Sequence, residues 1–269
     1  NPTRNSLGRV ALVFAETFNQ QHNNGMDLNG ALGGDFFSVS APTVTPFTSN
    51  TGISGVNARI IDLNQLTTND YELSFNGTAW QVTSSDGTTS ALATPVVAVT
   101  TTINFDGIQF DISSTSVPNT GDAFTIRPTF SGARTLDVVV SDPNQIAAAS
   151  PIRTLSSDAN LGDATISPGF ATDPNNVNLL SPVTLTFATS LVTPPDTVLI
   201  SDSIVIVGPT TYAAGAEIPY TKGMQINSNG WQANLTGTPQ VGDTFSIESN
   251  TGGVGDNRNM LSLAQLQTT

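Results

Sequence analysis

His22 is the single histidine of the chain and lies in the stretch AETFNQQHNNGMDLNG, which begins at Ala15. A histidine can act as a general base or bind a metal, but a base needs a positioned partner and a zinc site needs three or four ligands. Neither lies near His22 in the sequence. The residue follows a helical pattern, and histidine is favoured at helix ends by the helix dipole. We therefore predict that His22 ends a helix and takes no part in catalysis.

The carboxylates are spread thinly along the chain. The closest aspartate pairs are Asp27 with Asp35, Asp106 with Asp111, and Asp196 with Asp202. These pairs lack the alternating ligands and the central glycine of a calcium-binding loop. The glutamates do not lie in the aromatic-rich setting expected of a glycosidase cleft. The sequence therefore predicts no metal site.

Other motifs match known catalytic patterns only in part. The stretch GISG at 52–55 lacks the spacing of a nucleophile elbow. The stretch TGGVGDN at 251–257 lacks the glycine spacing and the basic residue of a phosphate-binding loop. The absence of cysteine excludes thiolate chemistry and disulfides. We predict no catalytic residue, no cofactor and no metal, and a protein that is not an enzyme.

The charge balance narrows the classes of partner. Eight basic residues against 21 acidic ones give a net charge of −13, which repels phosphate backbones and anionic lipids. The apolar runs are short and interrupted by aspartate, so no segment is expected to span a bilayer. We predict neither nucleic acid nor membrane as a partner. The opening NPTRNSLGRV lacks the features of a signal peptide, and we expect the chain to be an internal part of a longer protein.

Two amphipathic patterns predict a helix near each end of the chain. From Ser6, the expected N-cap, to His22, apolar residues recur at i, i+3, i+4, i+7 and i+11. After the capping cluster in GDNRN at 255–259, apolar residues again follow helical spacing. We expect a helix-pairing or assembly face formed by Leu7, Val10, Phe14, Phe18, Met260, Leu263 and Leu266.

The first helix is predicted to stop abruptly after His22. Asn23, Asn24 and Gly25 can adopt the left-handed conformation of a C-cap, and Asn29-Gly30 can turn the chain out of the helical layer. We therefore assign His22, Gly25 and Gly30 to the helix exit and its turn.

The interior of the chain is predicted to be β. It is dense in threonine, serine, glycine and proline, and stretches such as DYELSF alternate apolar with polar residues. A short connector helix is expected at Ser141–Ser150, with Asp142 as its cap and Pro143 in its first position.

An internal repeat is the most specific feature of this interior. The stretch INFDGIQFDISSTSVPNTGDAFTI at 103–126 aligns with INSNGWQANLTGTPQVGDTFSI at 226–247, and YELSF at 71–75 can be set against VTLTF at 183–187. The DG and NG pairs predict two-residue hairpin turns. After each Gly-Asp turn, alternation predicts core positions at Phe124, Ile126, Phe245 and Ile247.

The two tryptophans, Trp80 and Trp231, are candidates for sugar-stacking platforms. Trp231 aligns with Ile108 in the repeat, and a core position tolerates such an exchange of an apolar for an aromatic residue. We predict Trp231 in the core. For Trp80 both interpretations stay open.

These observations predict a mainly β fold with flanking α segments. Two β-rich outer modules are inserted between an outgoing N-terminal helix and a returning C-terminal helix. The expected divisions are residues 1–36 for the inner helical segment and its exit loop, 37–165 for the first β-rich domain with the connector, 166–250 for the second, and 251–269 for the return to the helical domain.

Three stretches resemble a known family: LGRVALVFAETFNQQHNNGMDLNGALGGDFF from Leu7, VVVSDPNQIAAAS at 138–150 and GDNRNMLSLAQLQ at 255–267. They are similar, in order and spacing, to the bacterial flagellar hook-associated protein 1 family of hook–filament junction proteins. The resemblance implies a secreted, extracellular structural subunit of the flagellum, exported unfolded by the type III apparatus and placed in an axial ring. It implies contacts with other copies, the hook protein and the second junction protein. It also implies an export chaperone that binds terminal regions absent here.

A surface adhesin or glycan-binding β module is the alternative, motivated by the tandem β units, the acidity and Trp80. Further β repeats in the parent gene would favour the adhesin, whereas long flanking helices would favour the axial protein.

Overall fold

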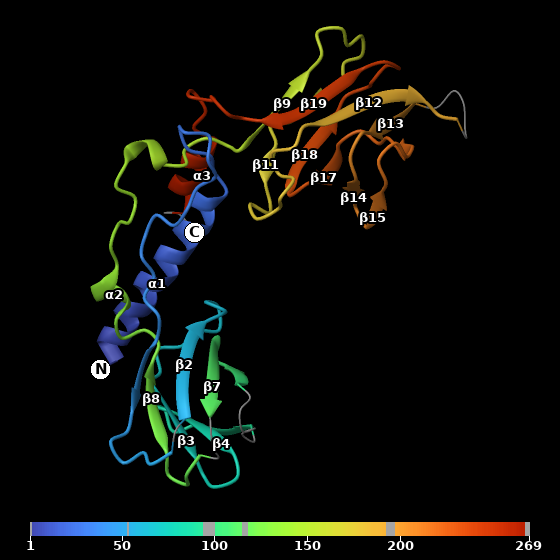
Figure 1. Ribbon diagram of the computed structural model, residues 1–269. Coiled ribbons are helices and arrows are strands. Elements are labelled where there is room, and N and C mark those ends of the chain that lie inside the picture. The colour runs from blue at the N-terminus through green and yellow to red at the C-terminus, as the bar shows by residue number, and fades with distance from the viewer. Residues whose placement is uncertain (1, 53, 94–99, 115–117, 192–196, 267–269) are drawn as a thin grey trace. The chain divides into compact units, whose positions relative to one another are not determined.

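The computed structural model describes residues 2–52, 54–93, 100–114, 118–191 and 197–266 (Figure 1). The chain forms two compact units. Unit 1 comprises Asn1–Thr17 and Phe37–Val139, and unit 2 comprises Phe18–Phe36 and Val140–Thr269. Helix α1 (Pro2–Asn23) contributes residues to both units. The predicted fold class is confirmed, because antiparallel strands dominate and a helix lies near each end of the chain.

Unit 1 contains two antiparallel sheets. Its elements after α1 are β1 (Thr43–Pro46), β2 (Ser54–Ile60), β3 (Tyr71–Phe75), β4 (Trp80–Ser84), β5 (Thr89–Ala93), β6 (Thr101–Phe105), β7 (Ile108–Ser114), β8 (Ala123–Arg127) and α2 (Gly132–Thr135). One sheet has the order β1-β8-β3-β4-β5 and the other the order β2-β7-β6. Their shared core includes Leu12 of α1, Leu73 and Trp80. Because the Trp80 side chain is fully buried, it offers no platform for a sugar.

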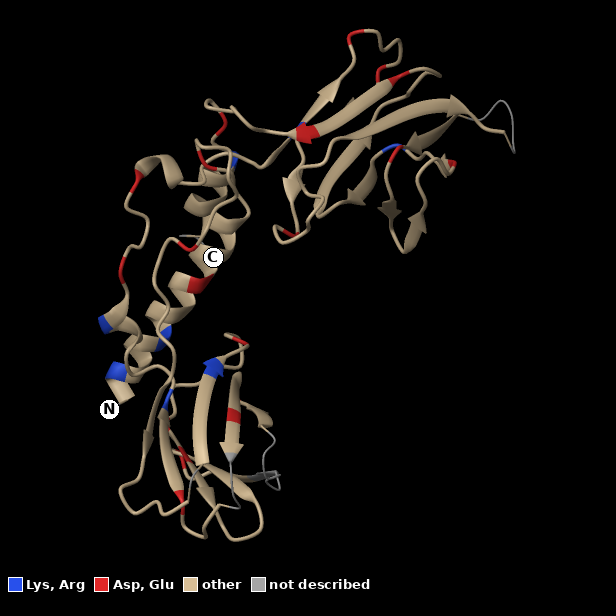
Figure 2. Ribbon diagram, viewed as in Figure 1, with Lys and Arg blue, Asp and Glu red and all other residues tan. Residues whose placement is uncertain are grey.

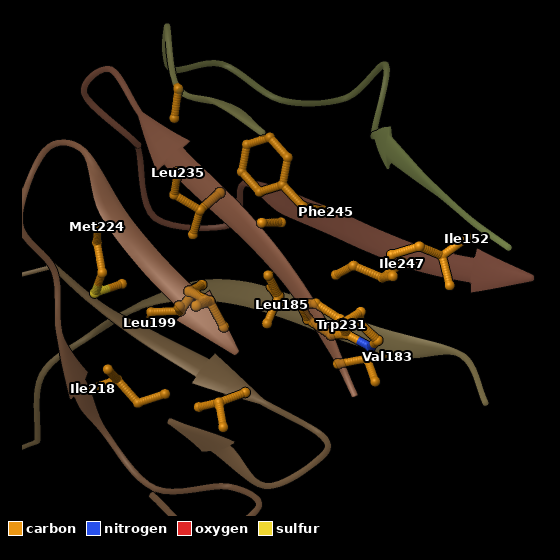
Figure 3. Packing of buried hydrophobic residues seen from close by; sticks show 14 of the residues in the cluster. Ile152, Val183, Leu185, Leu199, Ile218, Met224, Trp231, Leu235, Phe245 and Ile247 are labelled. Atoms are coloured by element: carbon orange, nitrogen blue, oxygen red, sulfur yellow. The ribbon is translucent and has the colours of Figure 1, made fainter. Parts of the chain in front are cut away.

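Unit 2 also pairs two antiparallel sheets. Its elements are the 3-10 turn η1 (Pro143–Gln145), β9 (Ile152–Ser156), β10 (Thr165–Ile166), β11 (Phe170–Ala171), β12 (Val183–Thr189), β13 (Thr197–Ser201), β14 (Val205–Val207), β15 (Thr210–Tyr212), β16 (Ile218–Pro219), β17 (Met224–Ser228), β18 (Trp231–Thr236), β19 (Thr244–Ser249) and α3 (Arg258–Gln265). One sheet has the order β10-β18-β17-β14-β15, with β11 also on β18, and the other the order β16-β13-β12-β19-β9. Trp231 lies in the core beside Val183 and Leu185 (Figure 3), as predicted.

Both predicted hairpin turns are confirmed. Asp106 and Gly107 join β6 to β7 with φ values of 47° and 74°, and Asn229 and Gly230 join β17 to β18 with φ values of 46° and 80°. A two-residue turn with positive φ at both positions matches the right-handed twist of the flanking strands. Local sequence alone therefore fixes these two hairpins.

The strand register shows that the repeat is structural as well as sequential. In unit 1, β3 and β8 align Leu73 with Phe124. In unit 2, β12 and β19 align Leu185 with Phe245. The two phenylalanines are buried, as the repeat predicts. YELSF and VTLTF are thus equivalent strands of two related β modules, defined here as residues 43–127 and 152–249.

A buried aspartate closes the first β module. Asp122 lies just before β8, and its Oδ1 accepts hydrogen bonds from the backbone N–H groups of Thr51 (2.9 Å) and Gly52 (3.3 Å). Its Oδ2 accepts from the backbone N–H of Asn119 at 2.9 Å. Asn50 adds two bonds to the backbone of Ala123, at 2.8 Å each. A side chain at Gly52 would collide with the Asp122 carboxylate.

The second β module repeats this arrangement. The aligned repeat contains the two aspartates but not the upstream segments that they bind. Asp243 Oδ1 accepts from the backbone N–H of Leu161 at 2.7 Å, and its Oδ2 accepts from that of Gln240 at 2.8 Å. Asn160 makes the two backbone bonds, here to Thr244. A side chain at Gly162 would again meet the carboxylate. The available signal was NTG at 50–52 and NLG at 160–162, lying far upstream of each Gly-Asp turn.

Three predictions about local structure need correction. Helix α1 begins at Pro2, so Ser6 lies inside it and is not its N-cap. The connector predicted at Ser141–Ser150 contains only the 3-10 turn η1, although Asp142 does cap it by accepting from the Asn144 backbone N–H. Strand β9 pairs with β19, so Ile152–Ser156 belongs to unit 2 and not to the first β-rich region predicted over 37–165.

We expect Asp122→Ala to destabilise the first β module, and Asp243→Ala the second, by about 3 kcal/mol each, because backbone N–H groups lose a charged acceptor. Hydrogen exchange of amides in β8 and β19 measures the effect on each module separately. Asp158→Ala, at an exposed aspartate in the loop after β9, is the control and should change neither. Equal protection in all three variants would contradict the proposed closing role.

Acid should weaken the same contacts. Burial acts to raise the pKa of Asp122 and Asp243, but backbone hydrogen bonds outweigh it and hold each pKa below its usual range. Since the unfolded chain binds the proton more readily, this stability is complete above the ordinary aspartate pKa of about 4 and is lost as pH falls through the lower folded value. Urea unfolding at neutral and acidic pH should show a smaller pH dependence in the double variant Asp122→Asn, Asp243→Asn than in the unaltered chain.

Candidate functional site

The three family-like segments meet around His22 in unit 2. The His22 side chain is fully buried in the last turn of α1. Its Nε2 accepts a hydrogen bond from the Ala147 backbone N–H at 2.9 Å, and its Nδ1 lies 2.7 Å from the Gly34 carbonyl oxygen. Because Nε2 must be an unprotonated acceptor, we assign the proton to Nδ1, which donates to Gly34. His22 therefore joins two loops and has no nitrogen left for a metal or a substrate.

Asn259 completes this junction from α3. Its Nδ2 donates to the Ala147 carbonyl at 2.6 Å, and its Oδ1 accepts from Gln21 Nε2 at 2.6 Å. Gly25 is the second residue after α1, and a side chain there would collide with Asn259 and Ala147. The Met26 backbone N–H donates to the Ala149 carbonyl at 2.8 Å. The end of α1, the 147–149 segment and the start of α3 are thus held together by bonds to backbone groups.

The loop after this junction turns at Gly30, whose φ is +80°. Asp27 organises the turn, because its Oδ1 accepts from the backbone N–H groups of Asn29 (2.9 Å) and Ala31 (2.8 Å). The Asp27 carboxylate therefore stabilises the turn by accepting backbone hydrogen bonds. The predicted turn at Gly30 is confirmed, but the predicted left-handed C-cap is wrong, because none of Asn23, Asn24 and Gly25 has a positive φ.

The buried face of α1 is unusually polar. Its buried residues follow a three-four spacing: Asn5, Gly8, Leu12, Ala15, Asn19 and His22. In unit 1, Asn5 donates to the Thr68 carbonyl at 3.0 Å and to Asp70 at 2.9 Å. In unit 2, Asn19 accepts from the Phe36 backbone N–H at 2.9 Å. This helix face is matched to irregular chain segments that present backbone donors and acceptors.

The apolar stripe of α1 is largely exposed. Leu7, Val10 and Phe14 are 61%, 64% and 48% exposed. The Phe14 ring packs against the ring of Phe37, with 5.3 Å between the two ring centroids. Phe18, in unit 2, is half-buried and lies 5.0 Å from the Phe36 ring. Leu7, Val10 and Phe14 therefore lie on a largely exposed face of α1, whereas Phe18 is partly covered by Phe36.

The remaining predicted residues lie on α3. Met260 is 39% exposed, Leu263 is buried and Leu266 is half-buried. Leu263 thus packs within unit 2, whereas Met260 presents part of its side chain outward.

The described chain offers little for catalysis or metal binding. No group of three or more histidine, aspartate or glutamate side chains gathers as a metal site in that part of the chain. A cavity of about 280 Å³ lies beside the junction, lined by apolar residues such as Met26 and Ile146 and by polar residues such as Asp27, Asn250 and Asp256. Acidic residues are scattered along the chain in both units (Figure 2). Among the described helices, none has the length and hydropathy needed to cross a membrane.

We expect His22→Ala to destabilise the junction by about 3 kcal/mol, since it leaves a cavity and two backbone groups without their partner. Hydrogen exchange of the Ala147 amide measures this directly. His22→Gln, which can offer both a donor and an acceptor, should lose less, and Gln20→Ala at an exposed position should leave the exchange unchanged. Unaltered Ala147 protection in His22→Ala would refute the assigned role.

Comparison with known proteins gives consistent matches. Residues 1–37 match a family described as "Flagellar hook-associated protein FlgK helical domain", and residues 46–128 match "Flagellar hook-associated protein 1, D2-like domain". Flagellar hook-associated protein 1 of Escherichia coli (strain K12) is 37% identical over 162 residues, which is 60% of this chain and 29% of that protein. The protein of the same name from Salmonella typhimurium is 33% identical over 163 residues, with the same coverage.

A solved structure agrees over nearly the whole chain. The flagellar hook junction protein FlgK from Burkholderia pseudomallei has a TM-score of 0.82 and 30% identity, covering 99% of this chain and 51% of its own. The chain therefore spans 29% of the length of the curated relatives and about half of the solved one.

These matches bear on two expectations. The relatives are structural flagellar proteins, which confirms the prediction that the chain is not an enzyme. The segments that meet at His22 are also those on which the family resemblance was based. In sequence over 60% of its length and in fold over 99% of it, the chain is similar to flagellar hook-associated protein 1 and to FlgK.

Proposed function

We propose that the chain is part of a structural subunit that joins hook and filament in the bacterial flagellum and assembles in an axial ring. The observation that carries this proposal is the apolar stripe of α1, where Leu7, Val10 and Phe14 are exposed. The other, more polar face of α1 is the one that packs against the rest of the chain, so the apolar stripe is not needed for packing within the chain.

Burial of this stripe would favour association. Each fully buried aliphatic or aromatic side chain contributes about 1.5–3 kcal/mol. A ring requires heterologous contacts, in which the stripe of one copy packs against a different surface of the next copy. We infer that Leu7, Val10, Phe14, Phe18 and the outward part of Met260 form this assembly face, with Leu263 and Leu266 supporting α3 behind it.

The partners of the whole protein follow from its family. We infer contacts with further copies, the hook protein and the second junction protein, and export through the flagellar type III apparatus with a chaperone bound to regions outside this chain. The inferred location is extracellular, in the flagellum. The relatives' printed names, hook-associated protein and hook junction protein, support this proposal.

The adhesin alternative loses Trp80, one of the three features that motivated it. Trp80 and Trp231 are both fully buried, so neither can stack on a sugar without unfolding its core. We therefore retain the structural role alone.

The double variant Leu7→Asp, Val10→Asp in the full-length protein should be exported but should fail to support filaments. Losing two apolar contacts predicts an association constant lower by roughly 100-fold. Electron microscopy of a strain lacking the native gene and complemented with each variant counts hooks with and without filaments. Val177→Asp, at a 94% exposed position in unit 2, is the matched control. Normal filaments in the double variant would disprove the assembly role of α1.

A further inference from the structure

The polypeptide enters and leaves the second β module, residues 152–249, at one end of that module. We define the helical base of unit 2 as residues 18–36, 140–150 and 253–266. Two of its three segments flank the module in the sequence, one just before residue 152 and one soon after residue 249. Here Ile152 of β9 pairs with Ser249 of β19, and the Asn250 backbone N–H donates to the Pro151 carbonyl at 2.9 Å. Without further contacts, the base and the module would be joined only by the two chain segments around residues 150–151 and 250–252. We call this connection the neck.

Arg258, at the start of α3, reaches across this neck. Its Nη2 donates to the Ile152 carbonyl at 2.8 Å, and its Nη1 donates to the Gly169 carbonyl at 3.0 Å. Ile152 belongs to β9, in the sheet that contains β19, whereas Gly169 directly precedes β11, which pairs with β18 of the other sheet. One guanidinium group therefore binds both sheets of the module.

Asp256 holds the Arg258 side chain in this position. The two form a short ion pair, with 2.7 Å between Arg258 Nη2 and Asp256 Oδ2, and Arg258 Nε also donates to the carboxylate. Asp256 is well shielded, with its side chain 14% exposed. Arginine is suited to such a role because its planar donors keep a fixed relative orientation.

The Asp256 carboxylate also accepts hydrogen bonds from both chain segments of the neck. Asp256 Oδ2 accepts from Asn250 Nδ2 at 2.7 Å and from the Ser150 backbone N–H at 3.3 Å. Asn250 donates in addition to the Ser150 carbonyl at 2.9 Å. Burial acts to raise the pKa of Asp256, but its bonds with Arg258 outweigh this and lower it, so the group is charged at neutral pH.

Neither side of the neck requires this pair for its own core. The apolar core of the module is built from residues of its two sheets, such as Val183, Trp231 and Phe245. Helix α3 is fixed to the base separately, through Asn259 and the buried Leu263. The pair is thus placed to set geometry rather than to hold either part folded.

We propose that Asp256 and Arg258 form a lock that fixes the direction in which the second β module leaves the helical base. This goes beyond the proposed function, because it concerns orientation within unit 2 and does not depend on assembly. Unit 2 has only three basic residues, Arg153, Lys222 and Arg258. Arg258 is the one that the structure places between module and base.

The chain has no cysteine, so two introduced cysteines can be spin-labelled without further changes. We choose Gln20→Cys on the exposed side of α1 for the base and Thr210→Cys, exposed on β15, for the module. Pulsed electron paramagnetic resonance on the 269-residue chain then measures the distribution of distances between the two labels. The indole N–H resonance of Trp231 reports whether the module core stays folded.

We expect a single narrow distribution in the unaltered background, and a width that roughly doubles in Arg258→Gln and in Asp256→Asn, with the Trp231 resonance in place. Arg153→Gln is the matched control, since it breaks the exposed Arg153–Glu248 ion pair of 3.1 Å on the same two strands. Its distribution should be unchanged.

The lock is overturned by a broad distribution in the unaltered chain or by unchanged widths in both variants. It is also overturned if both variants lose the native Trp231 resonance, because the pair would then be needed for folding. Should only one variant unfold, the width in the other decides the question.

Discussion

The architecture depends on one constraint: buried backbone polar groups must be hydrogen-bonded, and the segments packed against α1 have no regular structure to satisfy them. The loops at 33–36 and 144–149 and the chain at 68–70 present backbone N–H and C=O groups to the helix. Asn5, Asn19 and His22 supply partners for them. A helix that serves irregular chain in this way must turn a polar face inward, and its apolar stripe is consequently left outside.

This constraint explains which parts of α1 could be predicted from sequence. The three-four spacing of Leu7, Val10 and Phe14 correctly indicates a helix, because periodicity records conformation. It does not record which face is buried. Pattern reasoning takes the apolar face as the inner one, and that holds only where the covering element is itself apolar. The buried spacing from Asn5 to His22 was present in the sequence, but asparagine is mostly exposed in folded proteins and is ordinarily assigned to the surface.

Sequence distance decides the rest. The hairpin turns at Asp106-Gly107 and Asn229-Gly230 are local, so residue types alone determine them. Asp122 and Asp243 bind segments about seventy to eighty residues upstream in the chain, and no local rule connects them. The repeat supplied the missing information only in part, since the NTG and NLG stretches lie outside the aligned region. Comparing the two copies over a longer stretch would have identified both closures, because each pairs Asn-x-Gly with Gly-Asp.

The low charge content gives the few charged contacts unusual weight. Charged residues make up 11% of the chain, and most structural polar contacts are made by asparagine, aspartate and hydroxyl groups to backbone atoms. Such contacts are short and act within one loop or between adjacent strands. Arginine has a longer reach and several donors in fixed directions, so it can bind carbonyl groups of two sheets at once. A chain with few arginines can place one where separate layers must be held in register, and Arg258, supported by Asp256, lies at such a point.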